Sequence, residues 1–199
     1  MIDVWLARSE RARACTDSLA RAVLGGRLGV PPMEVQIRRR CLRCGATDHG
    51  KPYVEGHPIH FSVSSAGDRV AVATASVGVG IDLVRVADMS MDAAGAILAP
   101  GEEADDDREL SIVWARKEAL LKATGDGLAI DPRSVRVSHP HAPAALLAWP
   151  QRTTHGVRLG DLALDPQDGY VSSVAWLSGT GTRIVVHPDA TALLKGAHL

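Results

Sequence analysis

The sequence predicts a mixed α+β fold, and three observations support that prediction. An apolar segment at residues 110–124 has helical spacing and is followed by Gly125 and Gly127, which are typical of a helix stop. The apolar run at residues 77–86 indicates a buried strand. Beyond the helix, short strand-like segments separated by proline-rich and glycine-rich turns indicate an antiparallel sheet. These segments lie at residues 134–138, 144–149, 170–176 and 183–187.

The first half of the chain is expected to combine strands with one long helix. A short opening strand at residues 2–7 precedes a helix that runs from Ser9, a suitable N-cap, to about Leu24. Gly25 and Gly26 are expected to stop this helix. Two further strands are expected at residues 33–40 and 69–75. A second helix is expected at residues 87–99, and a C-terminal tail from residue 187 onward.

Two charged residues, Glu118 and Lys122, interrupt the apolar central helix one turn apart. The simplest interpretation is an i,i+4 ion pair, which stabilises a helix by about 0.2–0.5 kcal/mol. A second carboxylate, Asp82, lies in the middle of the buried strand, where a lone charge is costly unless it is paired or bound to a metal. Mg²⁺ uses one or two carboxylates together with waters and substrate phosphate oxygens. The residues therefore predict Mg²⁺-assisted phosphoryl-group transfer.

Four segments that follow one another along the chain resemble the 4′-phosphopantetheinyl transferases. The chain length and the extra N-terminal half look like the surfactin-type branch of that family. The resemblance spans at least residues 50–128 and extends more weakly over the whole chain. The segments are Gly50-Lys51-Pro52, Phe61 to Asp68, Gly80-Ile81-Asp82, and Trp114-x-x-Lys117-Glu118-Ala119-x-x-Lys122-x-x-Gly125-x-Gly127-Leu128.

The resemblance implies an α+β fold of two similar lobes in a pseudo-twofold arrangement, with a coenzyme A cleft between them. Residues 1–78 are expected to form the lobe for the adenine and 3′-phosphate end of coenzyme A. Residues 79–199 are expected to hold the metal, the catalytic helix and the docking surface for a carrier protein. The implied reaction transfers 4′-phosphopantetheine from coenzyme A to a serine of an apo acyl or peptidyl carrier protein and releases 3′,5′-ADP.

The resemblance also implies roles for individual residues. Mg²⁺ is expected on Asp82 and Glu118, and Glu118, directly or through a metal-bound water, is expected to accept the serine proton. Lys122 is expected to stabilise charge on the phosphate oxygens as the pyrophosphate bond breaks. The residues expected to bind coenzyme A are Lys51, Pro52, Ser64, Ser65, Arg11 and Lys122.

Some of these assignments have a physical basis of their own. Pro52 would fix a bend, Gly50 would let the backbone approach a ligand, and Lys51 would offer a point charge for phosphate. Arg11 and Arg13 belong to a group of arginines around the first helix. A solvated basic face is the simpler interpretation of that group.

Two positions depart from the family pattern. Ser65 stands where relatives usually carry a histidine that bonds a coenzyme A phosphate, and a hydroxyl brings no positive charge. His60 and Arg69 are candidates to compensate. Val84 stands where many surfactin-type members carry a further acidic metal ligand, so water is expected in that position. These departures support a second hypothesis, a relative that binds coenzyme A without turnover.

Two cysteines give a third hypothesis from a different class. Cys41 and Cys44 are separated by two residues, and histidines follow at His49, His57 and His60, as in the first half of a zinc motif. A structural zinc site normally needs four ligands, and only the two thiolates have firm spacing. The simpler interpretation is a turn beside the substrate cleft, and the alternative is a zinc-dependent interaction domain.

Composition and charge narrow the function classes. A net charge of −1 argues against a general nucleic-acid binder. The longest apolar run is too short to span a membrane, and Met1-Ile2-Asp3 lacks the basic start of a signal peptide. The three cysteines, an odd number, suit a reducing compartment. We therefore expect a cytoplasmic monomer without nucleic-acid or membrane partners.

Overall fold

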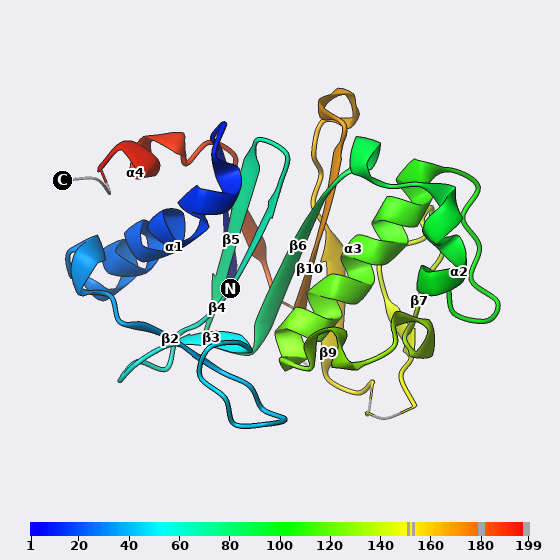
Figure 1. Ribbon diagram of the computed structural model, residues 1–199, viewed down its shortest axis with the longest axis horizontal. Coiled ribbons are helices and arrows are strands. Elements are labelled where there is room, and N and C mark those ends of the chain that lie inside the picture. Colours follow the sequence, from blue (N-terminus) through cyan, green and yellow to red (C-terminus); the bar gives the residue numbers. More distant parts are fainter. Residues whose placement is uncertain (151, 153, 179–181, 197–199) are drawn as a thin grey trace.

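A computed structural model describes residues 1–150, 152, 154–178 and 182–196, and its architecture is α+β, which confirms the predicted fold class (Figure 1). Two sheets are each covered by one long helix, α1 (Ala12–Leu28) or α3 (Asp107–Thr124). The first sheet has the order β11 (Ile184–His187), β1 (Ile2–Arg8), β5 (Arg69–Ala75), β4 (His60–Ala66). The second sheet has the order β6 (Val79–Arg85), β10 (Tyr170–Leu177), β9 (Val157–Asp161).

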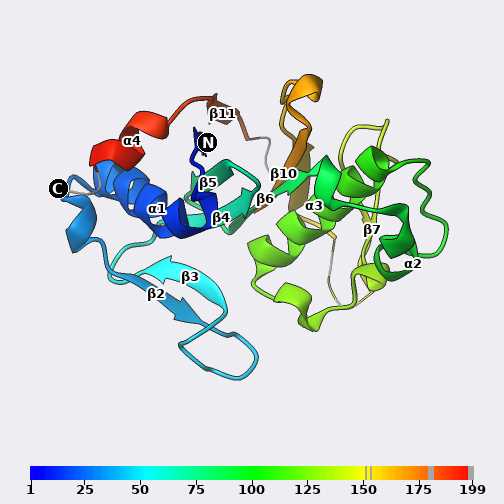
Figure 2. The same cartoon turned by 45° about the horizontal axis from the view of Figure 1, so that its top comes forward.

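Three hydrophobic clusters hold these elements together. The first lies between the two sheets, with β1 and β5 on one side and β6 and β10 on the other. The second lies between the first sheet and α1, and the third lies between the second sheet and α3. The layers therefore follow the order helix, sheet, sheet, helix, and Figures 1 and 2 show the two helices on opposite sides of the strands.

The remaining elements are short. Two small hairpins lie outside the main sheets, and the first of them, β2 with β3, projects from the body in Figure 2. None of the described helices is long and apolar enough to cross a membrane. The short elements are β2 (Ile37–Arg40), β3 (Lys51–Val54), β7 (Arg136–Val137), β8 (Leu146–Ala148), α2 (Ala94–Ile97) and α4 (Thr191–Gly196).

Two buried serines join β4 to β6 at the junction of the two sheets. The Oγ of Ser62 accepts the backbone N–H of Ile81 at 3.1 Å, and the Oγ of Ser64 accepts that of Leu83 at 3.2 Å. Buried backbone N–H groups must find partners. The serine hydroxyls supply them here, so the two edge strands lie side by side without a ladder between them.

Helix α3 is buried around most of its circumference, as the sequence predicted. The carboxylate of Asp106 caps its first turn by accepting the N–H of Glu109 at 2.8 Å, and Gly125, with a φ of 83°, ends it. Two cations on this helix, Arg116 and Lys117, are fully buried.

Both buried cations are paired and hydrogen-bonded. Arg116 forms an ion pair with Asp161 at 2.6 Å, and the Nζ of Lys117 lies 2.5 Å from a carboxylate oxygen of Glu102. Removing one partner of such a buried pair costs about 3–5 kcal/mol. Each cation also donates to backbone carbonyls, so the two side chains tie α3 to its surrounding loops. The accepting carbonyls are those of Ser138, His139, Pro140 and Ala142 for Arg116, and Ile97 and Pro132 for Lys117.

Three sequence predictions about local structure are wrong. Helix α1 continues through Gly25 and Gly26 and ends at Gly29 with a φ of 71°, because Gly25 is buried and serves close packing against the segment at Val30 and Pro32. The predicted helix at residues 87–99 contains only the single turn of α2 and short 3₁₀ turns. The tail predicted from residue 187 onward contains α4, and the strand predicted at residues 183–187 is β11, which pairs in parallel with β1 outside the predicted antiparallel sheet.

The C-terminal segment returns to the first sheet. Strand β11 pairs with β1 in parallel, and Leu194 of α4 is buried in the cluster under α1. The predicted division of the chain into lobes at residues 1–78 and 79–199 stays a prediction.

The packing of β6 against α3 gives a stability prediction. A methyl group on Gly80 would overlap the carbonyl oxygen of Ala119 and the amide nitrogen of Ala123. Because these atoms belong to the helix backbone, we expect Gly80→Ala to lower the free energy of unfolding by about 1–3 kcal/mol, as overpacking does. Urea unfolding followed by circular dichroism measures this. Gly95→Ala is the control, since its added methyl would meet open space, and equal stability of both variants would contradict the packing.

Candidate functional site

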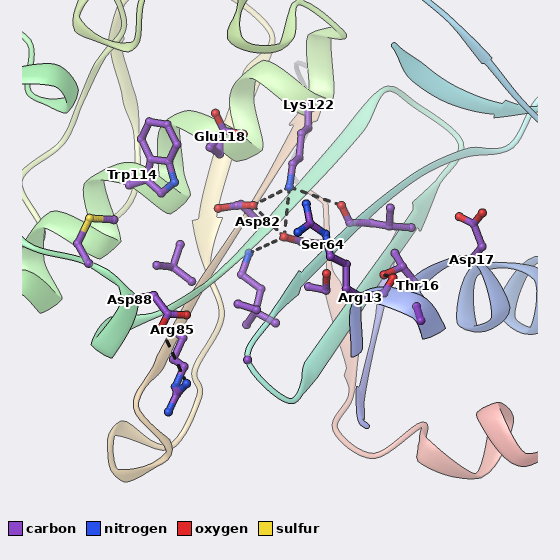
Figure 3. A pocket seen from close by; sticks show the side chains of 18 of the residues that line it. Arg13, Thr16, Asp17, Ser64, Asp82, Arg85, Asp88, Trp114, Glu118 and Lys122 are labelled. Carbon is purple, nitrogen blue, oxygen red and sulfur yellow. Dashed lines mark hydrogen bonds and ion pairs between the residues drawn. The ribbon is translucent and has the colours of Figure 1, made fainter. Parts of the chain in front are cut away.

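A cleft of about 920 Å³ opens where β4, β6 and α3 meet (Figure 3). We call it the first cleft. It brings together five residues that the sequence had assigned to the site. These are Ser64 and Ser65 from β4, Asp82 from β6, and Glu118 and Lys122 from α3.

Asp82 is the centre of the hydrogen bonds in the first cleft. Its side chain is buried, and its Oδ1 accepts from the Oγ of Ser64 at 2.9 Å and from the Nζ of Lys122 at 2.6 Å. The ammonium also lies 3.2 Å from the Ser64 hydroxyl. The buried carboxylate is therefore paired through both a cation and a hydroxyl, which a buried charge requires.

The hydroxyl of Ser64 is fully used within the protein. Its one proton goes to Asp82, and its oxygen accepts the N–H of Leu83 and faces Lys122. The geometry therefore makes Ser64 a residue that holds Asp82 and Lys122 in place. Its predicted contact with coenzyme A is not tested by this arrangement.

Glu118 differs from Asp82 in having an unsatisfied oxygen. Its Oε1 is buried and has no hydrogen-bond partner among the described residues. Burial raises the pKa of Glu118, the negative charge of Asp82 raises it further, and the positive charge of Lys122 opposes both effects. An unsatisfied carboxylate oxygen beside a second carboxylate fits a divalent cation with oxygen ligands, so these two residues could hold Mg²⁺.

A second cleft of about 810 Å³ adjoins the first and shares Arg39, Val63 and Lys122 with it. Lys51 and Pro52 line the second cleft, as do apolar residues that include Phe61 and Leu121. The mixture of cationic and apolar side chains is typical of sites that bind small molecules.

Lys51 points toward the C-terminal end of α3. Its Nζ donates to the carbonyl oxygen of Ala123 and lies 3.5 Å from that of Val79. A cation is favourable near the last carbonyls of a helix. Burial lowers the pKa of Lys51 to about 8. In this structure the ammonium supports α3, and its predicted contact with phosphate stays a prediction.

The bend at this segment has a different cause from the one predicted. Lys51 and Pro52 lie within β3, and the turn is made by Gly50 with a φ of 96°. A methyl group on Gly50 would overlap the backbone of Arg40 across the hairpin. The glycine therefore allows a close approach of the chain to itself.

Of the two arginines near the start of α1, Arg13 lines a cleft and Arg11 does not. Arg11 is the exposed N-cap of α1 and lines neither cleft, whereas Arg13 lies two residues further on and lines the first cleft beside Ser64 (Figure 3). The candidates to compensate for Ser65 also lie elsewhere. Arg69 pairs with Asp168 at 2.6 Å, and His60 lies outside the lining of both clefts in the described part of the chain.

Trp114 is a lining residue to which the sequence analysis had given no role in the site. It lies one helical turn before Glu118, and Lys122 follows one turn later, so the three side chains lie along one face of α3 (Figure 3). Their i, i+4, i+8 spacing could have revealed this face.

The comparisons with known proteins all indicate one enzyme family. Residues 78–175 match a family model described as the 4'-phosphopantetheinyl transferase superfamily. A 4'-phosphopantetheinyl transferase of Bacillus subtilis is 28% identical over 132 residues, which are 61% of this chain and 56% of the relative. The same figures hold for 4'-phosphopantetheinyl transferase Sfp of B. subtilis strain 168. The transferase ffp of B. subtilis is 28% identical over 115 residues, 52% of this chain and 51% of the relative.

The matched regions span about half the length of these curated relatives. The family-model match at residues 78–175 includes the β6 strand with Asp82 and the α3 helix with Glu118 and Lys122. Through residues 78–175, the chain is similar to the 4'-phosphopantetheinyl transferase superfamily.

Proposed function

We propose that this protein transfers 4′-phosphopantetheine from coenzyme A to a serine hydroxyl of an apo acyl or peptidyl carrier protein, with release of 3′,5′-ADP. The observation that carries this proposal is the convergence of Asp82, Glu118 and Lys122 at one cleft. Its relatives in B. subtilis are named for this transfer.

Asp82 and Glu118 would hold a Mg²⁺ ion. The unsatisfied Oε1 of Glu118 and the neighbouring carboxylate of Asp82 support this assignment. When bound, the ion would neutralise charge on the pyrophosphate of coenzyme A. Val84 packs against Ala115 and Val171 and offers no ligand oxygen, so the two carboxylates are the protein ligands of this proposal.

Glu118 would accept the proton of the attacking serine hydroxyl. Its carboxylate lines the first cleft beside Asp82, where the serine would approach the pyrophosphate. Lys122 would donate to phosphate oxygens as the pyrophosphate bond breaks, because its ammonium is partly exposed and lines both clefts. Ser64 would keep Asp82 and Lys122 in register during this step.

Coenzyme A would bind across both clefts. Arg13 and Ser65 line the first cleft, where they would face the pyrophosphate. Lys51, Pro52 and Arg39 line the second, where a cation and an apolar wall would suit the 3′-phosphate and the adenine. The carrier protein would approach from the α3 side of the first cleft.

Replacement of Glu118 tests the proposed base. We expect Glu118→Gln to lower the rate of transfer by at least about 10²-fold, because an amide cannot accept the serine proton. Mass spectrometry of an apo carrier protein incubated with the variant, coenzyme A and Mg²⁺ measures the rate. Glu103→Gln, on the exposed loop before α3, is the matched control and should keep full activity. A Glu118→Gln enzyme of wild-type rate, folded by circular dichroism, would contradict the assignment.

Removal of divalent ions tests the proposed metal. Without Mg²⁺, the carboxylates of Asp82 and Glu118 would repel the pyrophosphate, so transfer should stop in excess chelator and return when Mg²⁺ is added. Calorimetric titration with Mg²⁺ should show one site in the wild type and a weaker site in Asp82→Asn. Unchanged transfer without any divalent ion would overturn the metal assignment. Binding of coenzyme A with no transfer to any of several carriers would favour the non-catalytic hypothesis.

A further inference from the structure

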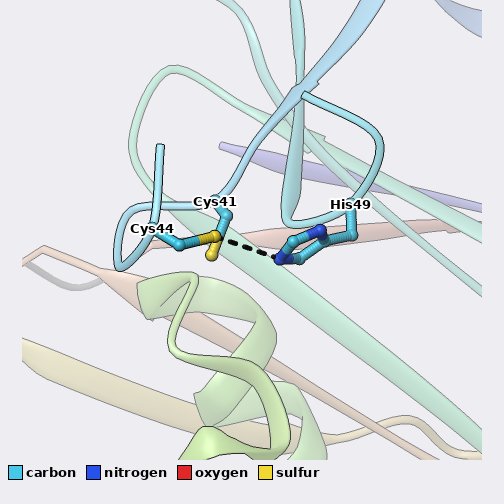
Figure 4. A group of neighbouring side chains, drawn as sticks. All are labelled: Cys41, Cys44 and His49. Carbon is cyan, nitrogen blue, oxygen red and sulfur yellow. Dashed lines mark hydrogen bonds between the residues drawn. The ribbon is translucent and has the colours of Figure 1, made fainter. Parts of the chain in front are cut away.

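A cluster of soft ligands lies in the loop that joins β2 to β3, beside the second cleft (Figure 4). Cys41 follows directly after β2, and His49 lies two residues before Lys51, the first residue of β3. The ligand atoms of Cys41, Cys44 and His49 all lie within 4.8 Å of one another, and the Sγ of Cys44 is 3.4 Å from the Nε2 of His49.

These separations are close to those of a zinc site. Zinc binds sulfur at about 2.3 Å and imidazole nitrogen at about 2.0–2.1 Å, which places tetrahedral ligand atoms about 3.5–3.8 Å apart. The cluster therefore needs a contraction of about 1 Å at most to reach that geometry. Thiolate and imidazole ligands together favour zinc over Mg²⁺ or Ca²⁺.

A neighbouring carboxylate orients the histidine as in many zinc sites. The Nδ1 of His49 lies 2.7 Å from the Oδ1 of Asp48. A carboxylate only accepts, so Nδ1 donates to Asp48, and Nε2 is the ring nitrogen that faces Cys44 and is available to a metal. Metal-bound histidines usually donate their second ring N–H to a carboxylate or carbonyl in this way.

The turn around Cys41 brings the two cysteines together. The N–H of Gly45 donates to the carbonyl oxygen of Cys41 at 3.0 Å, and Gly45 has a φ of 73° that closes the turn. The N–H of Cys41 donates to the carbonyl oxygen of Ala46 at 2.8 Å, so the backbone on both sides of Cys44 is held against Cys41.

We infer that Cys41, Cys44 and His49 bind one Zn²⁺ ion, with the fourth coordination position left to water from the second cleft. All three side chains line that cleft. The ion would hold the ends of β2 and β3 together and would fix the loop that precedes Lys51.

The ion would act on the loop and not on the fold. The three main hydrophobic clusters contain none of the three ligands, and Leu42, at the centre of the turn, is 67% exposed. Zinc loss should therefore loosen the wall of the second cleft without unfolding the protein. This differs from the zinc-dependent interaction domain of the sequence analysis, which would unfold with a chelator.

Metal analysis of the purified chain, kept under a reducing agent, tests the site. We expect one Zn²⁺ per chain after zinc addition and dialysis, and near zero for the Cys41→Ser/Cys44→Ser double variant. Cys15→Ser is the matched control, because Cys15 lies in α1 outside the cluster, and it should keep one Zn²⁺. Zinc should protect two of the three thiols from alkylation, and His49→Ala should weaken that protection.

Several outcomes would overturn the site. They are wild-type protein that retains no zinc under the reducing agent, or equal zinc in the wild type and the double variant. Substitution with Co²⁺ gives a second readout, since thiolate-to-metal charge-transfer absorption should appear in the wild type and disappear in the double variant.

The effect on coenzyme A rests on the proposed function, whereas zinc binding does not. Calorimetry should show several-fold weaker coenzyme A binding by the double variant than by the zinc-loaded wild type, while circular dichroism shows that the variant is folded. If the double variant and the zinc-loaded wild type bind coenzyme A with equal affinity, the role of the loop in coenzyme A binding is contradicted, but zinc binding is not. Absence of coenzyme A binding in the zinc-loaded wild type would instead count against the proposed function.

Discussion

The buried carboxylate of Asp82 is the constraint on which the rest of the site depends. Burying a charge is costly without partners, and the chain supplies Ser64 from the adjacent sheet and Lys122 from the helix. Ser64 also receives the N–H of Leu83, so the bond that pairs the carboxylate belongs to the junction that joins the two sheets. The site and the sheet junction are therefore one structural feature. A change that loosens the junction would also displace Lys122.

Helix α3 carries its buried charges and its cleft-lining charges on different faces. Arg116 and Lys117 are fully buried and bind loop carbonyls and carboxylates, which fixes the rotation of the helix. Glu118, the next residue, points into the first cleft with Lys122 one turn later (Figure 3). Rigid placement of catalytic side chains depends on supporting contacts of this kind. Adjacent residues in the sequence thus serve opposite purposes because they lie on different sides of one helix.

The sequence was sufficient to predict that buried charged residues would be brought together. A carboxylate in an apolar strand and a charged pair in an apolar helix predicted a common site, and Asp82, Glu118 and Lys122 do meet at one cleft. The sequence was insufficient where the direction of a side chain depends on tertiary contacts. Nothing local shows that Lys51 faces the end of α3, that Arg13 reaches the cleft while Arg11 does not, or that Gly25 packs inside a helix. Paired glycines do not end a helix when one of them is needed for close packing.

The charge balance of the first cleft gives an independent reason for a divalent ion. Four basic and four acidic side chains line it, so its formal charge is balanced: Arg13, Arg39, Arg85 and Lys122 against Asp17, Asp82, Asp88 and Glu118. A pyrophosphate entering such a cleft would meet four carboxylates as well as four cationic side chains. Ser65, in the place of a cationic side chain, leaves this balance unchanged. A cation shared by Asp82 and Glu118 would convert the repelling carboxylates into ligands, and the arginines and Lys122 would then face the phosphates unopposed by them.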